Sequence, residues 1–353
     1  MKSSARATLA ILVAPALLLT ACGGGSDPQN SKLTGANAKG QPDVNGDGKV
    51  VIGVLSIGDT HDKGFFQSFV DDANTIARSN GWEVRTIDNL KASDAKNQAL
   101  NLCRQRVDLI AIGSGDLGSA LDAAPEPTCK DTNWYLNGGA GQIKQTKYFN
   151  QSLDSVNQTL YTAGYAAGLE LKEQNATKVG FITGPEEDYA KQAVKAFTKG
   201  AQAVVPNAEV ISAYTGSFDD AAVNVESFNT MKEKGIKVVY PYLGGATDAV
   251  TKKANEAKPL IPALSSGTDR CMDTTVKYEI SVVFAPGAFF AAALQRFQKG
   301  DLKMGEATRY VIGKDPVPSV KFCNPVGDQA EKITELMKSI GDETFDVDKA
   351  VDG

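Results

Sequence analysis

The 353-residue chain has a single histidine, His61, and lacks the short motifs that mark common enzyme classes. Serine-type hydrolysis depends on a histidine base, and no Gly-x-Ser-x-Gly elbow is present. No Gly-x-x-x-x-Gly-Lys-Ser/Thr loop is present, and Thr183-Gly184-Pro185 lacks the glycine spacing that cradles a pyrophosphate. The sequence does not exclude a hydrolase that uses paired carboxylates, because the two acids can lie far apart in a chain. These absences predict a protein that is not an enzyme and has no cofactor.

Basic residues are outnumbered by acidic ones. The chain has 37 Lys and Arg against 42 Asp and Glu, which gives a formal charge of −5. Loss of residues 1–21 would remove Lys2 and Arg6 and no acid, and would change this charge to −7. We therefore expect no nucleic acid as a partner.

Long apolar runs are confined to the N-terminus. Lys2 and Arg6 precede an apolar run at 7–20, which is shorter than the ~20 residues that span a bilayer and is typical of a signal peptide. Its end, Leu19-Thr20-Ala21-Cys22, matches the bacterial lipobox, in which the cysteine thiol receives a diacylglycerol group. We predict a signal peptide at 1–21 and lipidation of Cys22 with palmitate, on the extracytoplasmic face of the bacterial cell membrane. An ordinary secretory signal with a chance cysteine is the alternative.

Residues 22–49 are polar and rich in glycine, which predicts a lipidated flexible tether. Asp43-Val44-Asn45-Gly46-Asp47-Gly48 resembles the start of a calcium loop. The twelfth position, where a glutamate is required, is Val54. We therefore assign the segment to the tether and predict no metal.

Four cysteines remain once Cys22 is lipidated, and they are Cys103, Cys129, Cys271 and Cys323. An even number in an exported chain suggests disulfides, and four cysteines allow three pairings. We favour Cys103 with Cys129 and Cys271 with Cys323, with free buried thiols as the alternative. The spacings do not resemble those of zinc sites.

From Val50 onward, short apolar runs typical of strands alternate with segments of helical period. The alternation restarts after Asn150, and about 300 residues exceed what one core usually accommodates. We predict an α/β fold with two doubly wound parallel-sheet lobes joined by a hinge. The predicted N-terminal lobe comprises residues 50–150 and about 265–300. The predicted C-terminal lobe comprises residues 151–264 and about 301–340.

Ligands on such sheets bind beside the loops at the carboxyl ends of the strands. The loop 57–64 leads into the helix that begins with Phe65, and it contains Asp59, Thr60 and Asp62. One interpretation makes Asp59 or Thr60 a helix cap, Asp62 a first-turn acid and Phe65 a core residue. The other places an aromatic face and a carboxylate together in a ligand cleft.

Several blocks in a fixed order resemble the basic-membrane-protein (BMP) family. These are Asp62-Lys63-Gly64-Phe65-Phe66-Gln67, Gly164-Tyr165-Ala166-Ala167-Gly168, Lys178-Val179-Gly180-Phe181-Ile182, Tyr214-Thr215-Gly216-Ser217-Phe218-Asp219-Asp220 and Gly267-Thr268-Asp269. The family consists of type I periplasmic substrate-binding lipoproteins of ABC importers, known as purine-nucleoside receptors with a Venus-flytrap fold. The resemblance covers roughly residues 50–312.

The resemblance implies a base sandwiched between aromatic rings and a ribose held by an acid. Phe65 would supply one ring, Tyr240 or Tyr242 the other, and Asp269 the ribose acceptor. On sequence alone, both tyrosines could instead pack at a sheet edge, and Gly244-Gly245 could be a turn. The candidate ligand-binding residues are His61, Asp62, Phe65, Phe66, Asp116, Tyr240, Tyr242, Gly244, Gly245 and Asp269.

Two residues depart from the family pattern. Phe66 stands where the family has asparagine, and Phe284 stands where a lysine is expected after the strand 280–283. An amide and a cation are thus replaced by apolar rings, which favours a more apolar or differently decorated ligand.

We predict a monomeric, lipid-anchored substrate-binding protein that delivers a small molecule, a nucleoside by resemblance, to an ABC permease in the membrane. The alternatives are a receptor for a sugar or sugar-like signal, or a sensor that works with a membrane kinase. An anchored nucleoside hydrolase is the enzyme alternative, and it would need catalytic acids and usually a metal.

Overall fold

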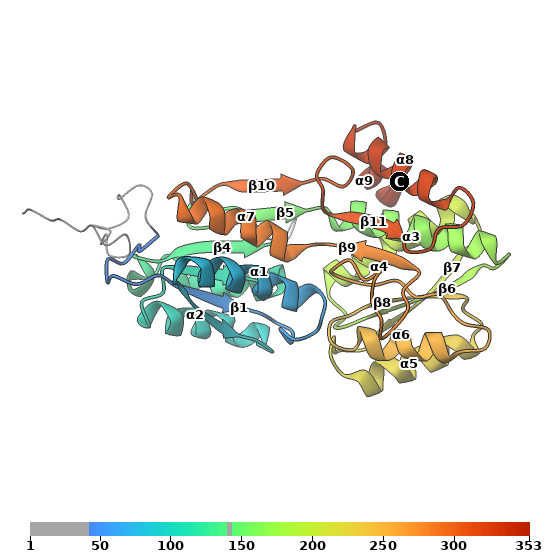
Figure 1. The fold of residues 1–353 in the computed structure, drawn as a ribbon, viewed down its shortest axis with the longest axis horizontal. Helices are drawn as coiled ribbons and strands as arrows, with labels where there is room; N and C mark the ends of the chain where they lie inside the picture. Colours follow the sequence, from blue (N-terminus) through green and yellow to red (C-terminus); the bar gives the residue numbers. More distant parts are fainter. Residues whose placement is uncertain (1–41, 140–142) are drawn as a thin grey trace, which may run out of the picture. The chain divides into compact units, whose positions relative to one another are not determined.

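Two parallel β-sheets, each covered by helices on both faces, organise the part of the chain that the structure describes, residues 42–139 and 143–353 (Figure 1). The structure is a computed structural model. The predicted signal peptide, Cys22 and most of the predicted tether lie outside the described residues. No helix among the described residues is long and apolar enough to cross a membrane.

The first sheet has the strand order β10-β5-β4-β3-β1-β2, and all neighbouring strands are parallel. Its strands are β1 (Val51–Leu55), β2 (Glu83–Ile87), β3 (Leu109–Ile112), β4 (Asn133–Asn137), β5 (Asn150–Asp154) and β10 (Ala307–Tyr310). β1 and β3 are buried along their whole length, as expected of central parallel strands with apolar sequences. We call this sheet and the helices packed on it the N-terminal lobe.

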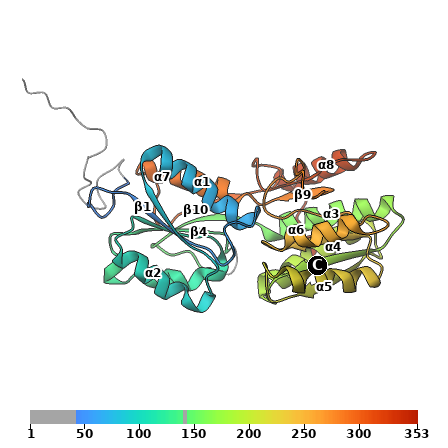
Figure 2. The same cartoon turned by 60° about the horizontal axis from the view of Figure 1, so that its bottom comes forward.

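Helices cover both faces of the first sheet, with α1 (Phe65–Asn80) and α7 (Pro286–Gln298) on one side and α2 (Ala95–Arg104) on the other (Figure 2). The rings of Phe69, Tyr135 and Phe290 stack between α1, β4 and α7. α1 ends at Gly81, whose left-handed conformation closes the helix as its sequence predicts. Short 3-10 helices span Ala92–Asp94, Gly115–Ala123 and Pro127–Cys129.

The second sheet has the order β7-β6-β8, again parallel, and Ala263 extends it beside Val239. The elements of this C-terminal lobe are α3 (Val156–Glu173), β6 (Lys178–Thr183), α4 (Asp188–Val204), β7 (Glu209–Tyr214), α5 (Ala221–Glu233), β8 (Val238–Tyr242), α6 (Thr247–Glu256), β9 (Ile280–Val283), β11 (Ser319–Phe322), α8 (Gln329–Gly341) and α9 (Val347–Asp352). β9 and β11 form a separate antiparallel pair. α3 and α4 approach so closely that a Cβ on Gly164 would lie 2.0 Å from the Phe197 carbonyl oxygen.

Within the described residues, the chain passes between the lobes three times. It leaves β5 for α3 at 154–156, leaves β9 for α7 at 283–286, and leaves β10 for the C-terminal lobe at 310–312. The fold is that of the predicted two-lobed α/β receptor.

The lobe boundaries differ from those expected at several points. The N-terminal lobe includes β5 as far as Asp154, although its boundary was expected at 150. Residues 280–284 pack in the core of the C-terminal lobe, in the same cluster as Phe181 and Leu264. β10 belongs to the first sheet, since it pairs with β5. The expected boundaries assigned each segment to the other lobe, because periodicity identifies a strand but not its partner.

The end of the predicted tether is anchored to the N-terminal lobe. Asp43 accepts hydrogen bonds from the backbone N–H groups of Asp47 and Gly48 at 3.1 and 2.8 Å. The fully buried carboxylate of Asp108 accepts from the backbone N–H groups of Val44 and Val51, both at 2.8 Å. The oxygens that resemble calcium ligands in the sequence thus hold a turn in front of β1.

The predicted disulfides are confirmed. Cys103 is bonded to Cys129, and Cys271 to Cys323. The first bond ties α2 to the short helix Pro127–Cys129, and the second ties the segment after residue 267 to the end of β11.

Removal of the Cys271–Cys323 bond by replacing both cysteines with alanine is expected to lower the free energy of unfolding by about 4 kcal/mol, from the loop entropy. The Cys103–Cys129 loop is shorter, with a separation of 26 rather than 52 residues, so its removal should cost slightly less. Guanidinium unfolding of the three proteins at equal pH measures both differences. A double variant as stable as the oxidised wild type would contradict this prediction.

Candidate ligand-binding site

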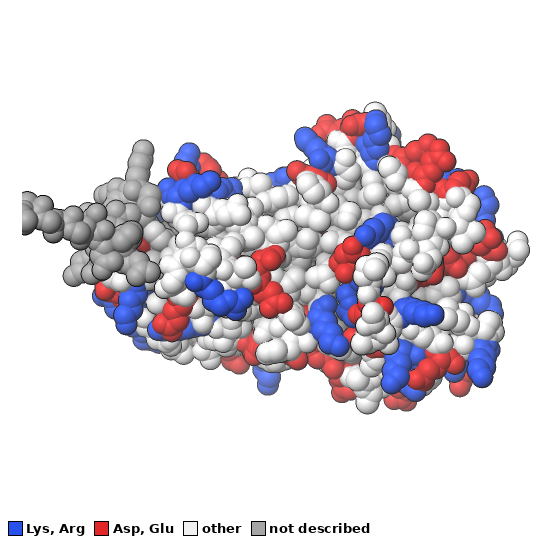
Figure 3. All heavy atoms as spheres, in the orientation of Figure 1, with Lys and Arg blue, Asp and Glu red and all other residues white. Residues whose placement is uncertain are grey.

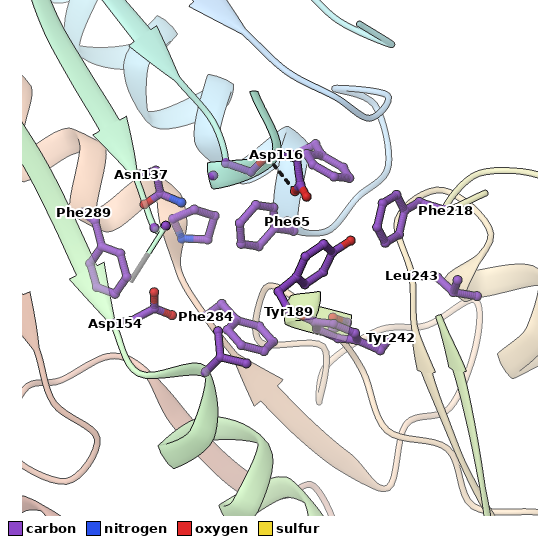
Figure 4. A pocket seen from close by; sticks show the side chains of 18 residues that line it. Phe65, Asp116, Asn137, Asp154, Tyr189, Phe218, Tyr242, Leu243, Phe284 and Phe289 are labelled. Carbon is purple, nitrogen blue, oxygen red and sulfur yellow. Dashed lines mark hydrogen bonds between the residues drawn. The ribbon is translucent and has the colours of Figure 1, made fainter. Parts of the chain in front are cut away.

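A cavity of about 130 Å³ lies at the carboxyl ends of the strands of both sheets. By the same measure one water molecule needs roughly 10–15 Å³, so the cavity has room for an organic molecule. Both lobes and two of the three crossings contribute to its wall (Figure 4). The described lining residues are Phe65, Phe66, Ser114, Gly115, Asp116, Asn137, Gly138, Gly139, Asp154, Val156, Tyr189, Phe218, Tyr242, Leu243, Ser266, Phe284, Pro286 and Phe289.

Aromatic side chains form most of the wall. Phe65 contacts Phe284 with ring centroids 6.3 Å apart, and Phe284 contacts Tyr242 at 5.8 Å. Phe66 of the N-terminal lobe meets Phe218 of the C-terminal lobe edge to face at 6.2 Å. The rings thus continue across the two lobes, and they suit a flat or apolar ligand.

Two carboxylates also line the cavity. Asp116 follows β3 and accepts a hydrogen bond from the Ser114 hydroxyl at 3.1 Å, while Asp154 ends β5. Burial raises the pKa of the Asp154 carboxyl to about 6. Burial also raises the pKa of Asp116, although the Ser114 hydroxyl opposes the shift. Both groups are hydrogen-bond acceptors when ionised.

A third acceptor is the side-chain amide of Asn137, which is 4% exposed. Its Nδ2 donates to the Gly113 carbonyl at 3.1 Å. Its Oδ1 has no partner among the described residues. A buried acceptor without a partner costs about 1–3 kcal/mol, so this oxygen suits a donor on a bound ligand.

Two tyrosine hydroxyl groups, of Tyr189 and Tyr242, supply donors in the described wall. Burial raises the pKa of the Tyr189 hydroxyl, and the neighbouring Asp116 carboxylate adds to the shift. Burial likewise raises the pKa of Tyr242, with Asp154 and Asp116 contributing. Both phenols therefore stay protonated at neutral pH.

The family model described as "ABC transporter substrate-binding protein PnrA-like" (Bmp) matches residues 49–343. The chain belongs to this family. BMP-family membership makes it a substrate-binding protein rather than an enzyme, and such proteins of ABC importers act outside the cytoplasm.

Relatives of this BMP-family chain include two bacterial proteins. An "ABC transporter nucleoside-binding protein BmpA" of Lactococcus lactis is 27% identical over 259 residues, which cover 72% of this chain and 69% of the relative. A "CD4+ T-cell-stimulating antigen" of Listeria innocua is 25% identical over 264 residues, with the same coverage.

Solved structures support the type I binding-protein fold. A solute-binding protein of an ABC transporter system from Aeropyrum pernix has a TM-score of 0.68 and 16% identity, over 86% of this chain and 90% of that one. Its counterpart from Conexibacter woesei has a TM-score of 0.59 and 17% identity, over 84% and 98%.

Four of the ten candidate residues line the cavity of this BMP-family protein, and these are Phe65, Phe66, Asp116 and Tyr242. Tyr242 rather than Tyr240 faces it. Tyr240 points to the same face of the sheet as Tyr242, two residues further along β8, but it is fully buried, with its ring 5.2 Å from that of Phe181. Only Tyr242, the last residue of β8, reaches the cavity. Phe66 and Phe284, the two departures from the BMP pattern, both belong to the wall.

Asp62 supports the wall without forming it. Its carboxylate accepts hydrogen bonds from the backbone N–H groups of Gly64, Phe66 and Gln67 at 2.8, 3.1 and 2.9 Å. It thereby caps α1, whose preceding residue Gly64 has no side chain to do so. The structural interpretation named Asp59 or Thr60 as the cap, but Asp62 takes this role, from a position before the first turn. Phe65 lines the cavity, as the other interpretation expects.

Gly244 and Gly245 lie beside the cavity but do not line it. The Gly245 N–H donates to the Asp219 carboxylate at 2.6 Å. A Cβ on Gly244 would lie 3.1 Å from the Phe66 ring. The pair forms a turn whose lack of side chains leaves room for Phe66.

Asp269 and His61 lie outside the wall. Asp269 forms an ion pair with Lys321 of β11 at 2.6 Å. The His61 side chain is 85% exposed and contacts Asp59 at 3.1 Å. Ligand atoms of Asp59, His61 and Asp88 lie within 4.8 Å of one another, but Asp88 already accepts the Thr60 hydroxyl at 2.9 Å, and we assign no metal there.

Several wall residues escaped the sequence analysis. Asp154 was missed because the apolar pattern of the sequence predicts a strand over 147–151, whereas β5 runs over 150–154 and ends at Asp154. Tyr189 follows the loop 183–188, whose position after a strand was a usable signal. Phe218 lies within a block that carries the family resemblance. Others include Asn137, Ser266 and Phe289.

Replacement of Asp154 by asparagine is expected to remove a pH-dependent part of the stability. The pKa of Asp154 is about 6 in the folded protein and about 3.9 in an unfolded chain. The folded state therefore binds more protons between these values, and the contribution of Asp154 to stability falls as pH rises from about 4 to about 6.

Across that window, the difference in unfolding free energy between wild type and Asp154→Asn should change by on the order of 1–2 kcal/mol. Urea midpoints at pH 4, 5, 6 and 7 measure it. The exposed Asp301→Asn serves as the control. A difference that is the same at all four pH values argues against a buried, shifted carboxyl.

Proposed function

We propose that this BMP-family protein is anchored to the outer face of the cell membrane through Cys22 and captures a nucleoside-like molecule for an ABC permease. The observation that carries the proposal is the cavity at the carboxyl ends of both sheets, which combines aromatic walls with hydrogen-bond acceptors. Flat bases stack on aromatic rings, and ribose hydroxyls donate to carboxylates.

Two further observations support the nucleoside class. The Lactococcus relative is described as nucleoside-binding. The ring of Phe65, which the family resemblance assigned to base stacking, is part of the wall. The lipobox at Cys22 supports the anchor, and the family supports the link to an ABC transporter.

Capture would involve closure of the lobes about the three crossings. Contacts that link the lobes include Phe66 with Phe218 and Lys63 with Asp248, whose charged atoms are 3.7 Å apart. The closed form would exclude water from the cavity, which strengthens its polar contacts.

The ligand class is tested by thermal unfolding of the soluble chain from Gly23 onward with purine and pyrimidine nucleosides, free bases and simple sugars. A ligand at about 100 times its Kd adds roughly 2.7 kcal/mol to stability and raises the midpoint. A rise with nucleosides supports the proposal. A rise with sugars alone keeps the fold and replaces the ligand.

Replacement of Phe65 by alanine is expected to raise the Kd of the responding ligand about tenfold, the equivalent of one lost stacking contact. Calorimetric titration measures the change. Phe345→Ala is the matched control. Phe345 is also partly buried and packs on another aromatic ring, that of Tyr161, but neither residue lines the cavity. Equal affinities for the two variants would reject the stacking role of Phe65.

A further inference from the structure

The charged side chains in the described wall of the cavity, Asp116 and Asp154, are both acidic. In the view of Figure 4, Asp116 and Asp154 lie on opposite sides of the rings of Phe65 and Phe284. None of the described lining residues is Lys, Arg or His. Residues 140–142, which the structure does not describe, are Ala, Gly and Gln. The third acceptor, Oδ1 of Asn137, adds to the negative character.

Two basic residues, Lys63 in the loop 57–64 and Arg270 beside it, form ion pairs with acids that do not line the cavity. Lys63 pairs with Asp248 at 3.7 Å, and the guanidinium of Arg270 pairs with the same carboxylate at 2.9 Å. Arg270 also pairs with Asp273, and its guanidinium lies 5.0 Å from the centre of the Tyr278 ring. Neither cation lines the cavity.

Of the helices that begin at the cavity, α1 has an N-terminus that is already occupied by an acid. A free helix start is a ready site for an anion because its backbone N–H groups are unsatisfied. At α1 those groups donate to Asp62, so the protein supplies its own anion there. An anionic ligand would meet two carboxylates and no basic side chain in the described wall.

A positively charged ligand group meets the opposite situation. It pairs with a partly buried carboxylate, and the aromatic faces attract it further. An uncompensated charge in a cavity of low dielectric is strongly unfavourable, so the sign of a ligand's charge outweighs smaller differences in contact.

We infer that Asp116 and Asp154 are the specificity residues of this cavity, and that they admit neutral donor-rich or cationic ligands and reject anionic ones. The inference rests on the proposed function only in requiring that ligands enter this cavity. Within the proposed class of ligand, the cavity would select by charge. Asp116 and Asp154, rather than Asp269, would accept hydrogen bonds from the ligand.

Three matched compounds test the inference with nucleosides. Adenosine is neutral, adenosine 5′-monophosphate is anionic, and 5′-amino-5′-deoxyadenosine carries an ammonium group at the same position; the uridine series is measured in parallel. Calorimetry at pH 7.5 should give an ammonium compound that binds at least as tightly as the nucleoside. The monophosphate should bind at least about 100-fold more weakly. Equal binding of nucleoside and monophosphate would overturn the inference.

Variants then assign the selectivity to residues. Asp154→Asn and Asp116→Asn are each expected to reduce the preference for the ammonium compound over the nucleoside by about 5–10-fold. The control Asp301→Asn removes one charge from an exposed position and should leave the preference unchanged. Circular dichroism checks that each variant is folded. If one variant does not fold, the other still tests the assignment. Unchanged preference in both folded variants would refute the assignment.

Small aromatic probes separate this inference from the proposed function. Benzylammonium and benzoate have similar size and opposite charge, and neither requires a nucleoside site. A raised unfolding midpoint with millimolar benzylammonium, which is absent with benzoate and lost in Asp154→Asn, supports charge selection even if no nucleoside binds. In that case the nucleoside assignment fails alone. Nucleoside binding together with an equal response to benzoate would instead retain the proposed function and reject charge selection.

Discussion

The cavity depends on the parallel arrangement of the strands in both sheets. Parallel strands deliver their carboxyl ends, and the loops that follow, to one edge of a sheet. The first crossing leaves from that edge, because Asp154 ends β5 of the first sheet, and the second crossing begins with Phe284, which follows β9. Both residues line the cavity. The same residues therefore serve as wall and as part of the connection between lobes. A ligand that contacts Asp154 or Phe284 acts directly on the segments that would bend during closure.

At the start of α1, the cavity is lined by the aromatic rings of Phe65 and Phe66, while the backbone N–H groups of the first turn are bound by Asp62. Asp62 accepts three backbone N–H groups, which stabilises the first turn and fixes the positions of Phe65 and Phe66 on it. Acidic and basic side chains are interspersed over the face of the molecule shown in Figure 3, whereas the described wall of the cavity holds acids alone. The charge of the interior thus differs from that of the visible surface, and it arises from a few residues placed by strand ends.

Much of the fold could be predicted from sequence, because its elements have strong periodic patterns. The periodicity predicts a strand over 178–183, a helix over 188–204 and a strand over 209–214, and β6, α4 and β7 have these bounds. Gly81 ends α1. The partners of strands were harder to predict, since β9 and β10 are short and their pairing depends on the path of the chain between lobes. Both disulfides were predicted in their actual pairing.

The site was predictable in part. Phe65 could be identified because it follows a strand-end loop and lies in a family block. Tyr240 and Tyr242 could not be told apart, because they lie two residues apart in one strand and share a face, and both rings pack on Phe181. Only the position of Tyr242 at the end of β8 brings it to the cavity. Asp269 was carried over from a family pattern, but in this chain Lys321 neutralises it outside the wall. A family resemblance therefore identifies which residue occupies a position, but it does not predict which side chains that residue contacts.

Phe66 and Phe284 change how the cavity can discriminate among ligands. Contacts with these rings gain about 25 cal/mol for each Å² of apolar surface removed from water, and this gain has no direction. Discrimination between ligands of similar shape therefore falls to the acceptors, Asp116, Asp154 and Asn137. A site whose buried acceptors are left unpaired rejects a ligand that lacks the matching donors far more strongly than one that lacks a methylene group. Apolar replacements in this wall thus concentrate specificity in three side chains, and two of these carry charge.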